Sequence, residues 1–270
     1  MRYMHPVKML GQNFLVDSNV IDRIIQIVDP QKDDHILEIG PGQGALTRKL
    51  LAEDLNLTAV ELDKRLAPLL TEEFASNGRV EILEADILDL DLCNTLTNRF
   101  EGKWKVAANL PYNISSQILF KFLETPQLFL KLVLMLQKEV GERLVALPGC
   151  KEYGILTPLC NLHFDIKKEF IVRPGSFNPS PKVDSVVLSF IPLQKPRVDV
   201  GDEKLFRRIV KGAFGQRRKT LNNSLKAAFP ELLPDILSEI FKVASIDPLR
   251  RGETLSISEF ARLTNAFLTF

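Results

Sequence analysis

The chain has 270 residues, of which 45% are hydrophobic and 26% are charged, and its formal net charge is +1. This length exceeds one ordinary domain and falls short of two full-sized ones, and the apolar content suffices for a sizeable core. The balanced charge excludes a general attraction to nucleic acid or membranes, so any basic surface must be local. The cysteines form no CxxC pair and the histidines are far apart in sequence, which argues against a disulfide framework and a metal site.

Up to residue 146, short apolar strands alternate with amphipathic helices. The expected strands are 34–40, 56–63, 79–88, 103–112 and 130–137. The expected helices are 17–30, 45–53, 64–75, 115–124 and 138–146. This alternation predicts an α/β fold with a mostly parallel, doubly wound, Rossmann-like sheet and right-handed crossovers.

The pattern changes in the second half of the chain. Residues 163–172 and 183–193 are predicted to be strands, and we expect them to complete the sheet as an antiparallel edge pair. Residues 192–202 form a polar linker that contains proline, and 203–270 has the pattern of several helices interrupted by prolines. We therefore predict an α/β domain over 1–195 and a small all-helical domain over 196–270.

Glycines and an acidic residue indicate a cofactor site at the rim of the sheet. Gly40 and Gly42 lie between the first strand and its helix, where glycine allows a tight turn and close approach of a ligand. Glu61 ends the second strand, where a carboxylate would accept hydrogen bonds from ribose hydroxyls. With Ala45, these residues also satisfy a loosened dinucleotide pattern, so NAD and a structural glycine turn remain alternatives at this point.

Two further strand ends count against NAD. The third strand ends in Asp86, whose carboxylate could accept a hydrogen bond from an adenine amine. The fourth ends in the run NLPY, residues 109–112, which joins an amide, a fixed proline and a tyrosine. Polar or acidic groups at successive strand ends along one rim predict a binding site more strongly than any one of them alone.

Seven motifs together carry a resemblance to a known family. In chain order they are GQNFLVD, LEIGPGQGALT, VELD, EADIL, NLPYNIS, SFNPSPKVDSVV and AFGQRRKTLNNSL. This series resembles the ribosomal RNA adenine dimethyltransferases, from about residue 8 to the C-terminus. The resemblance implies a methyltransferase sheet and S-adenosylmethionine as the cofactor. The chain departs from the family at Met9-Leu10, where a basic residue is often found.

The same resemblance implies roles for individual residues in cofactor binding. Gln12, Asn13 and Leu15 would line the methionine end, which Gly40 and Gly42 would approach. Glu61 would hold the ribose and Asp86 the adenine amine. Leu62 and Ile87 would flank the adenine ring, and Asn109 would border the same site.

The NLPY run suits the chemistry of methylating an adenine amine. The side-chain oxygen of Asn109 and the carbonyl of Leu110 or Pro111 can accept the two amine hydrogens, which stabilises the charge that develops on nitrogen. Tyr112 offers a ring on which a flipped base can stack, and Phe177 could close the other face. An ordinary role for Phe177 in the core is the alternative.

A local basic segment lies in the predicted helical domain. Between 204 and 226 there are eight Lys or Arg residues and no Asp or Glu. A solvated helical face is the ordinary explanation, but the lack of counter-charges favours a phosphate-binding surface. The candidate RNA-binding residues are Arg207, Arg208, Lys211, Arg217, Arg218 and Lys219.

The resemblance implies dimethylation of the 6-amino group of two adjacent adenosines in the 3′-terminal hairpin of small-subunit (16S) ribosomal RNA, within a pre-assembled small subunit. The alternatives are an NAD-dependent oxidoreductase and a non-catalytic RNA-binding or ribosome-assembly protein. The N-terminus lacks an apolar signal core, and the most apolar run is too short to span a bilayer. We therefore expect a soluble cytoplasmic monomer that binds neither membrane nor metal.

Overall fold

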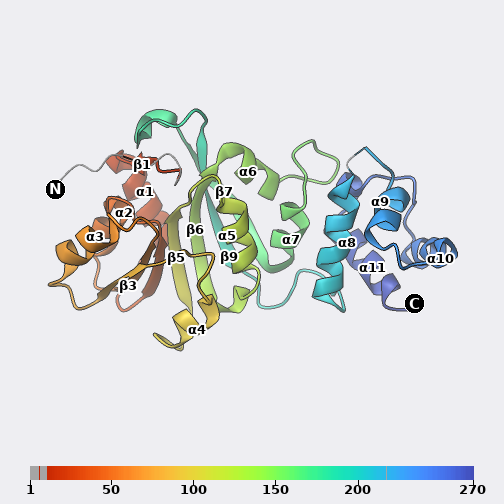
Figure 1. Cartoon of the computed structure of the whole chain (residues 1–270), viewed down its shortest axis with the longest axis horizontal. Helices are drawn as coiled ribbons and strands as arrows, with labels where there is room; N and C mark the ends of the chain where they lie inside the picture. Colours follow the sequence, from red (N-terminus) through yellow and green to blue (C-terminus); the bar gives the residue numbers. More distant parts are fainter. Residues whose placement is uncertain (1–5, 7–10, 217) are drawn as a thin grey trace. The chain divides into compact units, whose positions relative to one another are not determined.

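The computed structural model describes residues 6, 11–216 and 218–270 (Figure 1). The chain divides into two compact units. The first contains the described residues up to Gly141 together with Asp165–Pro192, and the second contains Glu142–Phe164 and Leu193–Phe270. The predicted boundary near 195 lies close to Leu193, but the contacts also assign 142–164 to the second unit, which the sequence pattern did not indicate.

A seven-stranded sheet forms the centre of the first unit, in the order β4-β3-β2-β5-β6-β9-β7. Its strands are β2 (His35–Ile39), β3 (Asn56–Glu61), β4 (Val80–Glu84), β5 (Trp104–Asn109), β6 (Phe129–Gln137), β7 (Phe164–Val172) and β9 (Ser185–Pro192). Neighbouring strands from β4 to β6 are parallel, whereas β9 runs antiparallel to β6. The Rossmann-like, mostly parallel sheet is therefore confirmed. The antiparallel strand lies one position in from the edge, which β7 occupies.

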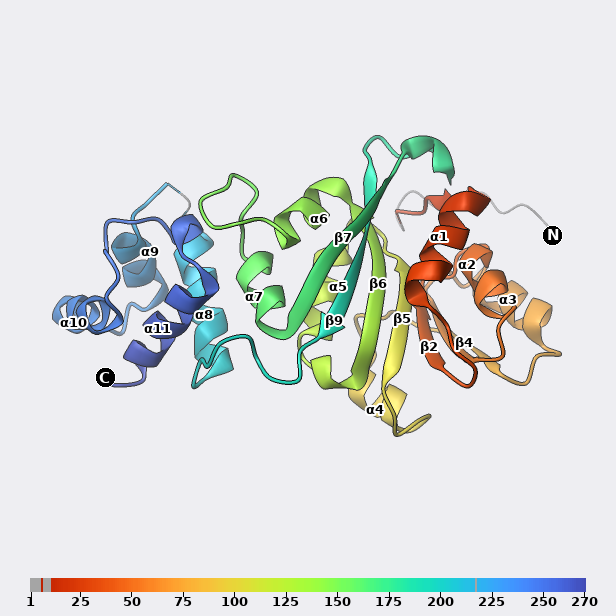
Figure 2. The same ribbon diagram turned by 180° about the vertical axis from the view of Figure 1, so that it is seen from behind.

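Helices cover both faces of this sheet. They are α1 (Ser18–Val28), α2 (Ala45–Leu50), α3 (Ala67–Phe74), α4 (Leu92–Thr97), α5 (Ser115–Phe122) and α6 (Lys138–Leu144), with a 3₁₀ turn at Pro126–Leu128. Helix α1 packs against α2, β5 and β6. It lies in front of the sheet in Figure 2, whereas α5 lies in front in Figure 1, so the two helices cover opposite faces.

Helix α1 shows how local sequence positions an element. The Asp17 carboxylate accepts hydrogen bonds from the backbone N–H groups of Asn19 and Val20, which caps the helix. Ile21, Ile24 and Val28 form its buried face and join the core between α1, α2 and the sheet. This core fixes the strands from one side, so their carboxyl ends are held in a common row.

A two-stranded antiparallel sheet joins β1 (Phe14–Leu15) to β8 (Phe177–Asn178). Strands of two residues have no detectable periodicity, so this pair could not be predicted from the sequence. A 3₁₀ turn at Pro174–Ser176 leads into β8. This pairing attaches the segment before α1 to the loop between β7 and β9.

The second unit is helical, as predicted for the C-terminal part of the chain. Its helices are α7 (Leu156–His163), α8 (Glu203–Gly215), α9 (Leu221–Ala228), α10 (Pro234–Ala244) and α11 (Ile257–Phe267), with a 3₁₀ turn at Gly252–Thr254. The Tyr153 hydroxyl donates to the Leu255 carbonyl at 2.8 Å, and α7 packs on α8 and α11. These contacts explain why 142–164 belongs to this unit. None of the described helices is both long and apolar enough to cross a membrane.

Candidate functional site

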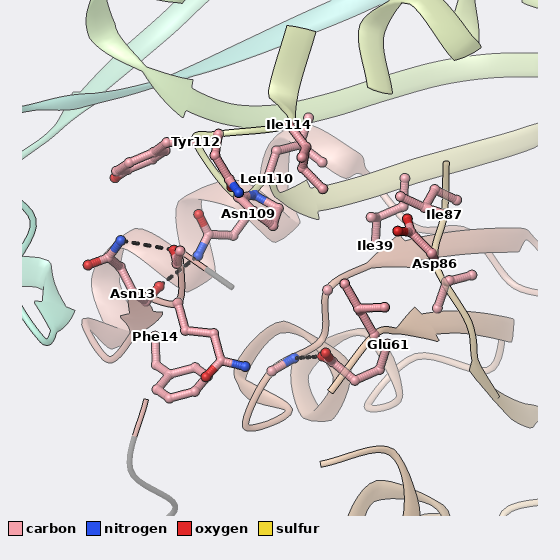
Figure 3. A pocket seen from close by; sticks show the side chains of 18 of the residues that line it. Asn13, Phe14, Ile39, Glu61, Asp86, Ile87, Asn109, Leu110, Tyr112 and Ile114 are labelled. Atoms are coloured by element: carbon pink, nitrogen blue, oxygen red, sulfur yellow. Dashed lines mark hydrogen bonds between the residues drawn. The ribbon is translucent and has the colours of Figure 1, made fainter. Parts of the chain in front are cut away.

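A pocket lies at the carboxyl ends of four adjacent parallel strands (Figure 3). Gly40 follows β2, Glu61 ends β3, Asp86 follows β4 and Asn109 ends β5. Because these strands are neighbours in the sheet, their ends form one continuous wall. The pocket is lined by Gly11, Gln12, Asn13, Phe14, Ile39, Gly40, Gly42, Val60, Glu61, Leu62, Ala85, Asp86, Ile87, Asn109, Leu110, Pro111, Tyr112, Asn113 and Ile114.

The glycine loop and Glu61 are connected by direct hydrogen bonds. Gly40 and Gly42 have φ angles of 65° and 58°, in the left-handed region that favours glycine. A Cβ atom on Gly42 would lie 3.0 Å from the Phe14 ring, so the loop also needs glycine for space. The Gly42 N–H donates to Glu61 Oε2 at 2.9 Å, and the Asp63 N–H donates to Oε1 at 2.8 Å. Burial raises the pKa of Glu61, while these backbone donors oppose the rise.

The segment that enters the pocket before β1 is anchored by a second carboxylate. Gln12 Nε2 donates to Asp63 Oδ2 at 2.8 Å. The Arg65 guanidinium donates to both oxygens of Asp63, at 3.0 and 2.7 Å, and holds the pKa of that buried carboxyl down at about 2. Asp63 is therefore ionised at neutral pH, and it connects the end of β3 with the chain around Gln12.

The orientation of the Asn109 amide is determined by its partner. Its Nδ2 donates to the Asn13 carbonyl at 3.1 Å (Figure 3). A backbone carbonyl can only accept, so the amide nitrogen must face it and Oδ1 must point the other way. Among the described residues, nothing donates a hydrogen bond to this oxygen. Asn109 therefore offers an acceptor to the pocket.

The two residues that follow Asn109 differ in how their carbonyls are used. The Leu110 N–H donates to the Met135 carbonyl at 3.1 Å, which continues the β5–β6 ladder. The Pro111 carbonyl accepts from the Ile114 N–H at 3.2 Å in a turn. Within the described ranges, the Leu110 carbonyl accepts no hydrogen bond. Of the two candidate carbonyls, that of Leu110 thus has both lone pairs available.

The Tyr112 ring borders the pocket and is held by its hydroxyl. The hydroxyl lies 2.6 Å from the Oγ of Ser185, a fully buried residue at the start of β9. Burial raises the pKa of Tyr112, and the hydrogen bond to Ser185 partly offsets the rise. The phenol is therefore neutral at physiological pH and presents an aromatic face with little freedom to rotate.

Asp86 and Ile87 lie side by side at the opposite end of the pocket from Tyr112 and Asn13, as Figure 3 shows. The Leu88 N–H donates to Asp86 Oδ1 at 2.8 Å. Ile87 is only 4% exposed and contributes an apolar wall. A carboxylate beside a flat apolar surface suits a purine ring that carries an amino group.

Most of the predicted site residues come together in this pocket, but Leu15 and Phe177 do not line it. They oppose each other in the β1–β8 pair and are buried in the hydrophobic core with Ile21. Leu15 instead lines a small adjoining cavity. Phe177 is 4% exposed, which corresponds to the core alternative, and its proposed stacking would require the ring to leave the core.

Several pocket residues were missed by the sequence analysis. They are Gly11, Phe14, Ile39, Val60, Ala85, Asn113 and Ile114. Ile39 and Val60 could have been found, since they precede Gly40 and Glu61 at the ends of strands. The position of Phe14 depends on β1, which has no sequence signal of its own.

The basic segment is less uniform than its composition indicated. Arg208 pairs with Glu231 at 2.7 Å, donates to the Ala228 carbonyl and stacks on Phe229, so it serves the fold of the second unit. This counter-charge lies just beyond 204–226, the stretch that contains no Asp or Glu. Arg218 and Lys219 are exposed and form no ion pair within the described ranges.

The other candidate RNA-binding residues have less distinctive surroundings. Arg207 and Lys211 lie on α8, half-buried and exposed respectively. Arg217 and Met9-Leu10 fall outside the described residues. No group of three His, Cys, Asp or Glu residues in the described part of the chain is arranged to hold a metal ion.

Comparison with known proteins places these features in a family context. The family model described as ribosomal RNA adenine dimethylase matches residues 6–263. The chain is 60% identical to ribosomal RNA small subunit methyltransferase A of Geobacter metallireducens, over 97% of this chain and 95% of that one. It is 45% identical to the Clostridium acetobutylicum protein of the same name, over 96% and 92%. The structure resembles a dimethyladenosine transferase from Plasmodium falciparum, with a TM-score of 0.77, 27% identity and coverage of 95% and 98%.

Proposed function

Because the chain belongs to the ribosomal RNA adenine dimethylase family, we propose that it transfers methyl groups from S-adenosylmethionine to the 6-amino groups of two adjacent adenosines in the 3′-terminal hairpin of small-subunit ribosomal RNA. The observation that carries this proposal is the pair of acceptors at the end of β5. Asn109 Oδ1 and the Leu110 carbonyl accept no hydrogen bond among the described residues, and an amine has two hydrogens to donate.

The residues of the pocket suit S-adenosylmethionine, which would supply an activated methyl group on sulfur. The glycine loop allows close approach, since Gly40 and Gly42 line the pocket with backbone that carries no side chain. Glu61 would accept from ribose hydroxyls, and Asp86 from the adenine amine, with Leu62 and Ile87 against the ring faces. Gln12 and Asn13 would border the methionine end, with Gly40 beneath them.

The target adenine must present a nitrogen lone pair that is normally delocalised into its ring. Two acceptors that bind the amine hydrogens favour a pyramidal nitrogen and stabilise the positive charge that grows during transfer. Asn109 is held in the required orientation by the Asn13 carbonyl, and Leu110 by the sheet, so neither must reorganise. Holding the nitrogen in line with the methyl group supplies further acceleration.

Tyr112 would stack on the flipped target base, because its ring borders the pocket and Ser185 fixes its hydroxyl. No strong general base is needed, since the methylated amine loses its proton readily to water. A second transfer requires that S-adenosylhomocysteine be exchanged for a new S-adenosylmethionine. The methylated amino group must also rotate about its C–N bond, so that its remaining hydrogen faces one of the two acceptors.

For the RNA, we propose that the second unit binds phosphates of the small-subunit RNA. The support comes from Arg218 and Lys219, which are exposed and form no ion pair with any other described residue. Further candidates are Arg207, Lys211 and Arg217. Arg208 is a weaker candidate because Glu231 neutralises it. We further propose that the enzyme acts as a cytoplasmic monomer on a partly assembled small subunit.

Transfer of labelled methyl groups to small subunits that lack the modification tests this function. Wild-type protein should label the RNA, and digestion to nucleosides should yield N6,N6-dimethyladenosine. A protein that binds the subunit without transferring label would be a non-catalytic assembly protein. Tight binding of NADH with no methyl transfer would instead favour an oxidoreductase.

A further inference from the structure

Lys121 connects the two ends of the pocket without lining it. It lies near the end of α5, the helix that begins directly after the 109–114 turn. Its Nζ donates to the Leu88 carbonyl at 2.8 Å. Leu88 belongs to the loop after β4 that carries Asp86 and Ile87, so α5 is tied to that loop through one ammonium group.

Leu88 in turn restrains the carboxylate of Asp86. The Leu88 N–H donates to Asp86 Oδ1, and the N–H groups of Asp89 and Leu90 donate to the Asp86 carbonyl at 3.1 and 3.3 Å. Hydrogen bonds within the loop therefore hold both the side chain and the backbone carbonyl of Asp86. Its link to α5 is the Lys121–Leu88 hydrogen bond, which acts on the same residue that fixes Oδ1.

The surroundings of Lys121 differ from those of an ordinary exposed surface lysine. Within the described ranges Lys121 forms no ion pair, so its charge is not committed to a carboxylate. Its side chain is half-buried, whereas Gln117, one turn earlier on the same helix, is exposed. A charged donor makes a stronger hydrogen bond to a carbonyl than a neutral donor does.

We propose that Lys121 is a positioning residue that holds the 86–88 loop in the geometry that selects adenine in the cofactor. This inference rests on the proposed function, which places the adenine amine at Asp86. A carboxylate accepts a hydrogen bond from the 6-amino group of adenine and repels the 6-oxo group of hypoxanthine. The preference between the two bases therefore depends on where the carboxylate is held.

Calorimetry with S-adenosylhomocysteine and S-inosylhomocysteine measures that preference directly. Wild-type protein should prefer the adenosyl compound. We expect Lys121→Met to reduce the preference by about threefold to tenfold, because the loop can shift once its external hydrogen bond is lost. Methionine and lysine have similar helix propensities, so α5 should persist. Lys121→Arg retains a cationic donor and should keep most of the preference.

Three controls separate the possible outcomes. Gln117→Met, at an exposed position one turn earlier on α5, should leave the preference unchanged. A Lys121→Met protein with a lowered melting temperature and an unchanged preference would overturn the inference. If the methionine variant does not fold, the preference of Lys121→Gln is compared with that of the wild type instead. If Asp86→Ala also leaves the preference unchanged, the adenine assignment of the proposed function fails and the inference fails with it.

Discussion

Replacing Asn109 by alanine should slow methyl transfer far more than it weakens binding of RNA or cofactor. The change removes an oxygen whose hydrogen bond to the target amine strengthens as positive charge develops on the nitrogen. Loss of one preorganised group of this kind costs about 10² to 10³ in kcat, or about 2.7–4 kcal/mol. The substitution also removes the Nδ2 bond to Asn13, which contributes about 1 kcal/mol to folding.

Asn109→Ala removes both the acceptor for the target amine and the donor to Asn13, and an aspartate at this position removes only the donor. Asn109→Asp keeps an oxygen that can accept from the amine, but it cannot donate to the Asn13 carbonyl. Two acceptors would then face each other, so the side chain should rotate and the rate should fall as well. We therefore expect Asn109→Asp to lie between wild type and Asn109→Ala.

Single-turnover rates at saturating RNA and cofactor measure this effect without contributions from product release. Asn98→Ala, an exposed asparagine after α4, is a matched control that should retain the wild-type rate. A near-normal rate for folded Asn109→Ala would refute the acceptor role. A loss confined to RNA affinity would mean that Asn109 binds the substrate without acting in the transition state.

The remaining predictions concern binding, stability and salt. Asp86→Ala should weaken S-adenosylmethionine binding by about 0.5–1.5 kcal/mol in calorimetric titration, and unchanged affinity would rule out its adenine role. Tyr112→Phe should transfer methyl groups faster than Tyr112→Ala, since stacking uses the ring, but should unfold at a lower temperature because a buried serine loses its partner. Arg218→Ala combined with Lys219→Ala should flatten the log–log salt dependence of RNA binding by about 1.4, whereas a solvated face predicts no change in slope. Glu38 is buried, and burial raises its pKa from 4.5 to about 8. Between these two pH values the unfolded chain loses the Glu38 proton while the folded protein keeps it, so the free energy of unfolding should fall as the pH rises. Glu38→Gln should remove this part of the decline in thermal melts from about pH 4 to pH 9.

The sheet and much of the pocket could be predicted because their signals are local. Each parallel strand is a short apolar run, and the order of strands places the residues after them along one rim. Gly40, Glu61, Asp86 and Asn109 could therefore be brought together without coordinates. The orientation of the Asn109 side chain could not be predicted in this way. Its oxygen faces the pocket because its nitrogen donates to the Asn13 carbonyl, which is 96 residues away in the chain.

Phe177 and Arg208 show which surroundings local patterns do not specify. Phe177 was a candidate for stacking, but the β1–β8 pairing places it in the core, and strands of two residues have no pattern to detect. Arg208 was counted as a phosphate-binding cation, but it pairs with Glu231, which follows α9 in the chain. In both cases the decisive neighbour comes from a contact that composition and spacing do not specify.

The central claim is that this protein dimethylates two adjacent adenosines in the 3′-terminal hairpin of the small-subunit RNA. Nucleotide-resolution mapping of methyl groups on previously unmodified small subunits, after incubation with the wild-type protein and S-adenosylmethionine, tests it most directly. We predict that two neighbouring adenosines in that hairpin each gain two methyl groups on the 6-amino nitrogen, and that Asn109→Ala leaves them unmodified on the same time scale. Methylation at another nucleotide, at another atom, or of large-subunit RNA alone would contradict the account.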